Sequence, residues 1–166
     1  MIFQETWEWV IRVSPYTGEP KTETRRLVFP TTGFTGHAQG SKNTITSAGQ
    51  YEVGKVYAVQ PGRGKKAVGR IKILEIRRDA DVRNLIPHSV RREGFDCEER
   101  FLWTWVKLRD KPLYREFEGY PFQFGIKDSA ESYLANEAFW LAVIERPQRL
   151  YDAVVYQFEK VERIEG

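Results

Sequence analysis

The segment from Tyr51 to Asp79 constrains the fold more than any other part of the chain. Two runs rich in Val and Ile, at residues 55–60 and 67–77, flank the sequence QPGRGKK, which holds two glycines and three basic residues. Such a pattern is typical of two antiparallel strands joined by a tight turn. We therefore expect a β-hairpin here, and the fold of the chain must include the sheet to which it belongs.

Further strand-like segments lie on both sides of this hairpin. Residues 7–13, 22–29 and 151–164 are rich in Val, Ile, Tyr, Phe or Trp, and each is predicted to be a strand. Helical patterns fall between the hairpin and the last of these strands. The order β-β-β-β-α-α-β predicts an α+β fold, a small β-barrel with short helices and a helical insertion over residues 112–148 before the last strand.

The two longer helices carry recognisable start and stop signals. Asp96 with Glu99, and Asp128 with Glu131, fit the capping box that opens a helix. Pro147 should stop the second helix. Helical spacing places three apolar residues of the first helix on one face: Phe101, Trp105 and Leu108.

Length and composition limit the class of protein. The 166 residues, of which 41% are apolar, are predicted to form one domain over residues 1–166, with a flexible polar loop at residues 30–50. One cysteine and two distant histidines do not make a Cys/His zinc site, and we expect no metal and no cofactor. We also expect no membrane span, no obligate protein partner and, with a single cysteine, a cytoplasmic location.

The charge is unevenly distributed along the chain. Residues 1–96 hold 16 Lys and Arg against 10 Asp and Glu, although the whole chain carries a net charge of only +3. This surplus is compatible with a phosphate-bearing partner such as RNA, and equally with an ordinary solvated surface. In the hairpin turn, Arg63, Lys65 and Lys66 are candidate phosphate contacts, or simply exposed turn residues.

The octet PKTETRRL, residues 20–27, concentrates polar chemistry near the N-terminus. Lys21 and Thr24 are three residues apart, an odd offset that sends side chains to opposite faces of a regular strand. They can act together only if Lys21 lies in the turn before the strand, or if a bulge intervenes. A neutral lysine can then take the proton of a threonine hydroxyl that attacks a carbonyl carbon. Alternatively, the octet is a solvated strand edge that Lys and Arg protect from pairing.

A second polar stretch, RREGF at residues 91–95, follows a predicted helix. Gly94 permits a tight helix end, and Glu93 directly before it can point into a cleft. By itself the stretch indicates an ordinary charged helix terminus.

Together these stretches resemble the ASCH family of PUA-like β-barrels, which are related to RNA-binding domains. The likeness covers roughly residues 7–108 and 151–161, and it rests on K-x-x-T-x-R, the strands VGKVYAV and GRIKILEI, and EGF followed by EERFLWTW. One bacterial branch hydrolyses N4-acetylcytidine to cytidine and acetate. Its catalytic lysine, threonine and glutamate correspond here to Lys21, Thr24 and Glu93. Residues 30–50 and 112–148 have no obvious counterpart in that branch.

The resemblance implies an amidohydrolase that needs no metal and acts on an acylated nucleoside. Thr24 would be the nucleophile, Lys21 its general base, and Glu93 the residue that orients the lysine or passes a proton. Arg25 and Arg26 are candidate contacts for an oxyanion, a substrate or RNA. Two alternatives are a non-catalytic module that binds RNA and a ribonuclease that uses the same pocket.

Overall fold

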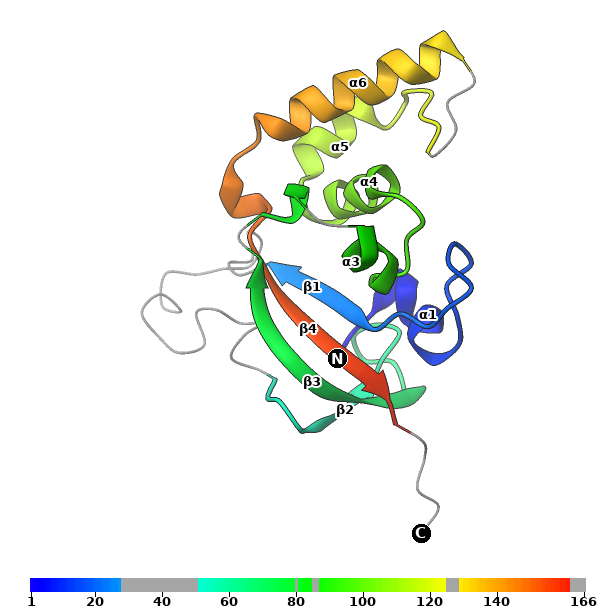
Figure 1. The fold of residues 1–166 in the computed structure, drawn as a ribbon, viewed down its shortest axis with the longest axis vertical. Helices are drawn as coiled ribbons and strands as arrows, with labels where there is room; N and C mark the ends of the chain where they lie inside the picture. The colour runs from blue at the N-terminus through cyan, green and yellow to red at the C-terminus, as the bar shows by residue number, and fades with distance from the viewer. Residues whose placement is uncertain (28–50, 80, 85–86, 125–128, 162–166) are drawn as a thin grey trace.

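The computed structural model describes residues 1–27, 51–79, 81–84, 87–124 and 129–161 (Figure 1). The polar loop predicted over residues 30–50 lies outside these residues. The described chain combines one curled antiparallel sheet with several helices, which agrees with the predicted α+β class and a barrel-like sheet.

Four strands form the sheet in the spatial order β1-β4-β3-β2, and every neighbouring pair is antiparallel. The bounds are Glu23–Leu27 for β1, Val56–Val59 for β2, Gly69–Asp79 for β3 and Ala153–Lys160 for β4. The predicted hairpin is therefore confirmed as β2 and β3. A register shift between Ile73 and Glu75 interrupts the pairing of β3 with β4, and the long strands curl into half a barrel.

Among the described residues, one α-helix precedes the sheet, and four follow β3 and precede β4 (Figure 1). The first is α1 (Trp7–Ile11), and the others are α3 (Pro87–Arg92), α4 (Glu98–Arg109), α5 (Lys111–Phe117) and α6 (Ala130–Ile144). Single 3-10 turns lie at Gln4–Thr6, Val82–Asn84 and Gln148–Leu150. Helices α5 and α6 fall within the predicted insertion at residues 112–148.

The prediction of a strand over residues 7–13 is wrong, because this segment contains α1. Three of its apolar residues follow helical spacing, since Trp7, Val10 and Ile11 pack into one cluster within the curl of the sheet. Alternation along a strand would have placed Val10, which is almost fully buried, on the same side as Glu8 and Arg12. Tertiary packing thus overrides the strand preference of Trp, Val and Ile.

The caps differ from the predicted pairs. Cys97, not Asp96, is the N-cap of α4 and makes no side-chain cap hydrogen bond, while Asp96 accepts a hydrogen bond from Arg100. In α6 the Ser129 hydroxyl accepts from the backbone of Ser132, and Asp128 lies outside the described residues. The helix ends at Ile144, ahead of Pro147 as predicted.

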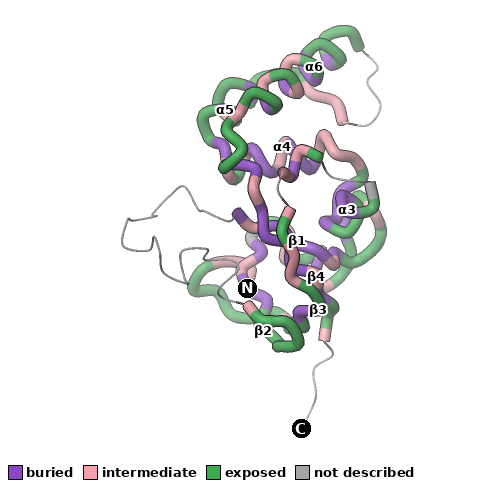
Figure 2. The backbone as a smooth tube through the Cα atoms, turned by 60° about the vertical axis from the view of Figure 1, so that its left-hand side comes forward, coloured by how far each residue is buried: buried purple, intermediate pink, exposed green. Residues whose placement is uncertain are grey.

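Two hydrophobic clusters hold the molecule together. One fills the curl of the sheet and is covered by α1, and the other joins the sheet to α3, α4, α5 and α6. The buried colour in Figure 2 follows most of β1 and β4; β4 contributes to both clusters, and β1 contributes Leu27 to the cluster beneath the helices. Polar side chains of β1 are therefore surrounded by protein on both faces.

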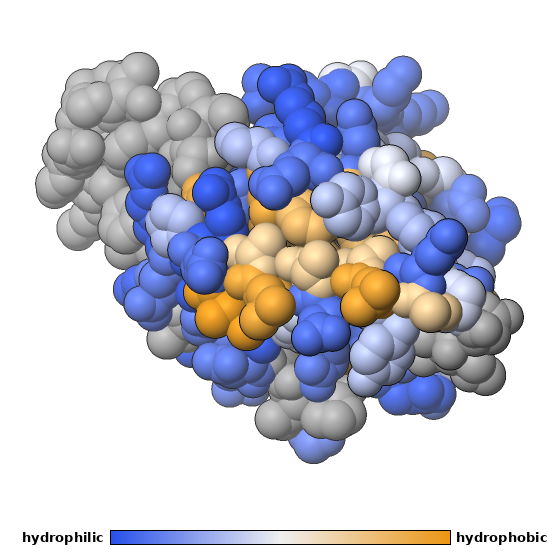
Figure 3. Space-filling view, turned by 90° about the horizontal axis from the view of Figure 1, so that it is seen from above, coloured by the Kyte–Doolittle hydropathy of each residue, from blue (hydrophilic) through white to orange (hydrophobic). Residues whose placement is uncertain are grey.

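The outer side of α6 stays uncovered. Tyr133, Leu134, Leu141 and Ile144 are exposed on this helix, and an apolar strip bordered by polar residues is visible from above the helices (Figure 3). In the described part of the chain, no helix is long and apolar enough to cross a membrane.

Candidate functional site

The backbone places Lys21 immediately before β1 and Thr24 within it. The amide of Lys21 donates to the carbonyl of Trp9 at 2.9 Å, and the amide of Thr22 donates to that of Arg92 at 2.9 Å. The strand begins only at Glu23, as the spacing of Lys21 and Thr24 required. Both side chains are buried, so the alternative of a solvated strand edge is wrong.

Glu93 owes its position to the end of α3. The amide of Glu93 donates to the Ser89 carbonyl, and that of Phe95 closes the turn on the Val90 carbonyl. Gly94 between them has a φ of 99°, in the left-handed region that favours glycine. The sharp reversal directs the Glu93 side chain towards β1, where it is buried.

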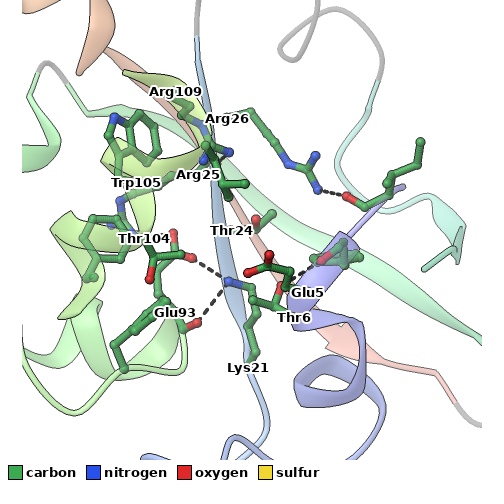
Figure 4. A pocket seen from close by; sticks show the side chains of 15 residues that line it. Glu5, Thr6, Lys21, Thr24, Arg25, Arg26, Glu93, Thr104, Trp105 and Arg109 are labelled. Atoms are coloured by element: carbon green, nitrogen blue, oxygen red, sulfur yellow. Dashed lines mark hydrogen bonds and ion pairs between the residues drawn. The ribbon is translucent and has the colours of Figure 1, made fainter. Parts of the chain in front are cut away.

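Lys21, Glu93 and Arg25 form a buried network of charges (Figure 4). The ammonium of Lys21 donates to Oε1 of Glu93 at 2.6 Å and to its backbone carbonyl at 3.0 Å. Arg25 Nη1 donates to the other oxygen, Oε2, at 3.1 Å. The structure therefore brings two of the three predicted catalytic residues into direct contact, with the carboxylate shared between two cations.

Arg25 is committed to carboxylates rather than free for a substrate. Besides Glu93, it donates to Asp79 Oδ2 at 2.7 Å and to Glu23 Oε2 at 3.2 Å. Glu23 in turn accepts from Arg77 and Arg92 at 3.0 and 3.2 Å. Arg25 lines the pocket, but this set of partners makes it the residue that anchors Glu93 to β1 and β3.

A pocket of about 270 Å³ opens above this network. Of the residues predicted for the site, five line it: Lys21, Thr24, Arg25, Arg26 and Glu93. The other lining residues come from the N-terminal segment and from α4 and the turn before it: Ile2, Phe3, Glu5, Thr6, Phe95, Phe101, Thr104, Trp105, Leu108 and Arg109.

The Thr24 hydroxyl is the free group of this pocket. It makes no hydrogen bond with any residue that the structure describes, and the side chain is 6% exposed. In Figure 4 it lies between the Lys21 ammonium and the arginines. Because the hydroxyl faces the pocket instead of being enclosed in the protein, a substrate can reach it.

Arg109 is the main site residue that sequence reasoning missed. It follows Trp105 by four residues. The helical spacing that places Phe101 and Trp105 on one face of the helix therefore places Arg109 on that face as well. Its guanidinium lies over the Trp105 ring, 4.2 Å from the centroid, and Nη2 donates to the Arg25 carbonyl at 3.3 Å.

Burial and charge act in opposite directions on Lys21. Desolvation lowers the pKa of Lys21, Glu93 opposes this, and the positive charges of Arg26 and Arg109 lower it further, so that it lies below its ordinary value of 10.5. Burial also raises the pKa of Glu93, but Lys21 and Arg25 outweigh it and hold this pKa below 4.5. Glu93 is therefore ionised, and Lys21 loses its proton more readily than an exposed lysine.

The basic turn that was predicted to contact phosphate lies outside the pocket. Arg63, Lys65 and Lys66 are exposed between β2 and β3 and do not line the pocket. Among the residues that the structure describes, no group of three or more His, Cys, Asp or Glu side chains is placed to hold a metal ion. Comparison of the chain with family models, curated proteins and solved structures finds no match.

Replacing Gly94 with alanine should destabilise the fold by about 2 kcal/mol, the strain of an unfavourable positive φ. An added Cβ would also lie 2.6 Å from Cε3 of Trp9. Urea unfolding measures the change, and Gly119→Ala, whose Cβ meets nothing within 4 Å, is the matched control. Equal stability of the two variants would contradict the role given to Gly94.

Glu93→Gln should cost about 3 kcal/mol at neutral pH, because it leaves buried cations without their counter-charge. Since folding lowers the pKa of Glu93 below 4.5, its stabilising effect is present above pH 4.5 and is lost as the pH falls through the folded-state pKa. Urea unfolding from pH 7 to pH 3 should therefore show wild type and variant converging in acid. The exposed Glu118→Gln is the control, and a constant difference for Glu93→Gln would refute the assignment.

Proposed function

We propose that the protein is an amidohydrolase of the ASCH type, with a PUA-like barrel, that removes the acyl group from an N4-acylated cytidine. One observation carries this proposal: a buried lysine with a lowered pKa contacts a carboxylate in a pocket that also holds an unpartnered threonine hydroxyl. The curled sheet with helices before its last strand supports the fold assignment.

The first step is acyl transfer to the enzyme. Neutral Lys21 takes the proton from the Thr24 hydroxyl, and the oxygen attacks the carbonyl carbon of the amide. A tetrahedral intermediate forms, and its oxygen carries the negative charge. The C–N bond then breaks, the amine of cytosine leaves with the proton from Lys21, and an ester on Thr24 remains.

The second step restores the enzyme. Lys21, again neutral, takes a proton from a water molecule that attacks the ester carbonyl. The C–O bond to Thr24 breaks, protonated Lys21 returns the proton to the Thr24 oxygen, and the carboxylic acid that leaves releases its own proton to solvent. Each atom is accounted for by the amide, one water and the two residues.

Glu93 positions the base in both steps. One carboxylate oxygen contacts Lys21 and the other contacts Arg25. The arginine stays protonated, whereas the lysine can lose its proton. The carboxylate therefore orients Lys21 without holding it fully in the charged form. The positive charges of Arg26 and Arg109 favour proton loss from Lys21.

The pocket walls suit a flat, polar-edged ring. Phe95, Phe101 and Leu108 give apolar surface, and Thr104 adds a hydroxyl to the same wall. A pyrimidine base can pack against the rings while its edge hydrogen bonds to polar groups.

Incubation with N4-acetylcytidine should release cytidine, which chromatography detects. Thr24→Val keeps the shape of the side chain but removes the hydroxyl, and it should lower kcat by at least about a thousandfold. Loss of the general base in Lys21→Met should cost about 10² to 10⁴-fold. Thr24→Ser should retain measurable turnover, because it restores the nucleophile.

No cytidine from the wild type at high enzyme concentration would overturn this proposal for that substrate. A labelled RNA oligonucleotide serves as the parallel arm. If the wild type cleaves this RNA and Thr24→Val does not, the protein is a ribonuclease and the proposed amidohydrolase activity is wrong. Salt-sensitive binding without cleavage or deacylation would favour an RNA-binding module, with Arg63, Lys65 and Lys66 as its contacts.

The rate should rise with pH. Because only neutral Lys21 accepts the proton, kcat/KM should increase through the pKa of Lys21 and level off above it, at a pH below 10.5. Burial lowers this pKa most, Glu93 raises it, and the charges of Arg26 and Arg109 lower it further. Arg109→Gln removes a repelling charge and should move the rise to higher pH, whereas the exposed Arg149→Gln should not. A rate independent of pH between 6 and 10 would exclude Lys21 as the base.

A further inference from the structure

The pocket holds more positive charge than the proposed chemistry uses. Its lining includes four cations and two carboxylates. Lys21 and Arg25 share Glu93, and Glu5 at the rim lies 3.5 Å from Lys107. Arg26 and Arg109 form no ion pair with any carboxylate in the part of the chain that the structure describes.

Both arginines are held in place by groups that leave their charge uncompensated. Arg109 stacks on Trp105 and donates to a backbone carbonyl. Arg26 donates to the carbonyl of Ile2, and its guanidinium carbon lies 5.4 Å from the centroid of the Phe3 ring. Carbonyls and rings fix the orientation of a guanidinium but do not neutralise it.

Arg26 also has an unused donor. Its Nε is buried and has no hydrogen-bond partner in the described structure. A buried N–H without an acceptor destabilises the folded state unless a ligand or a water molecule accepts its hydrogen bond. Burial, with repulsion by the Arg26 charge, lowers the pKa of Arg109 to about 10. Two arginines that are held in place, line one pocket and lack a counter-charge can bind an anion there.

The position of this pair separates it from the reacting groups. Arg26 follows Thr24 by two residues on β1, so it lies on the same face and about 7 Å farther along the strand. In Figure 4, Thr24 lies between the Lys21 ammonium and the two arginines. A substrate whose amide meets Thr24 can extend towards the arginines.

We propose that Arg26 and Arg109 bind a phosphate monoester of the substrate, so that the enzyme acts on an acylated nucleotide rather than on the free nucleoside. This inference rests on the proposed function. The charge of the pair selects the ligand: a phosphate monoester carries about −1.5 to −2 at pH 7, which two arginines match, whereas a carboxylate carries only one charge. Arginine also presents a planar fork that fits two phosphate oxygens.

Binding of inorganic phosphate tests the site without any turnover. Phosphate should raise the Tm of the wild type more than chloride or acetate does at equal ionic strength, because a ligand of the folded state stabilises it. Arg109→Gln and Arg26→Gln should each weaken phosphate binding at least about tenfold, the loss of a charged hydrogen bond. Arg149→Gln, which changes an exposed arginine outside the pocket, should bind phosphate as the wild type does.

Three results of this assay would overturn the proposal: phosphate no better than chloride, equal binding by all variants, or loss of binding in Arg149→Gln as well. If Arg109→Gln fails to fold, Arg109→Lys replaces it. Lysine keeps the charge but lacks the fork, so phosphate should bind this variant less tightly than the wild type. Unchanged binding by Arg109→Lys and by Arg26→Gln would count against the pair.

Turnover tests the choice of substrate. The wild type should have a kcat/KM at least about tenfold higher for N4-acetylcytidine 5′-monophosphate than for N4-acetylcytidine, and Arg109→Gln should bring the ratio close to one. Equal values in the wild type would overturn the nucleotide preference while leaving the amidohydrolase intact. If neither compound reacts, the proposed function fails, and phosphate binding alone decides whether the anion site exists.

Discussion

The ion pair between Lys21 and Glu93, with Arg25 on the second carboxylate oxygen, is the interaction on which the site depends. It joins three separate parts of the fold: the turn before β1, the end of α3 and, through Asp79, the end of β3. Buried charges are costly, and removing one partner of a buried ion pair leaves the other uncompensated. The backbone that carries these residues is therefore held to one arrangement, and the walls of the pocket follow from it.

The same network sets the chemistry that the pocket can perform. A lysine paired with a carboxylate of its own would stay protonated, and one without a carboxylate would lack a fixed orientation. Burial lowers the pKa of Lys21 more than Glu93 raises it, while the carboxylate, shared with Arg25, fixes the orientation of the ammonium. Arg26 and Arg109 contribute to this balance from the other side of Thr24, so the charge that would attract an anion also favours the free base.

Local patterns predicted the parts of the structure that depend on neighbours in sequence. Hairpin β2–β3, helix α4 and the placement of Lys21 before Thr24 follow from turn residues, helical spacing and strand alternation. The parts that depend on the order of the strands could not be predicted from the sequence. No local pattern indicates that Asp79 and Arg25, on different strands, form an ion pair. The segment 7–13 was misassigned because Trp and Val suit strands as well as a short buried helix. Arg109 was missed because it joins the site only when α4 packs opposite β1, and the sequence does not show that packing.

The order of strands also fixes when the site can form during folding. Strand β1 pairs only with β4 in the described sheet, so Thr24 gains its cross-strand neighbour, Tyr156, from a segment more than a hundred residues later in the chain. Contacts of such long sequence separation form late, because closing the intervening chain costs entropy before they stabilise anything. A ribosome-bound chain that ends before β4 has Thr24, the proposed nucleophile, on an unpaired strand, and this wall of the pocket is completed only after residues 153–160 are synthesised.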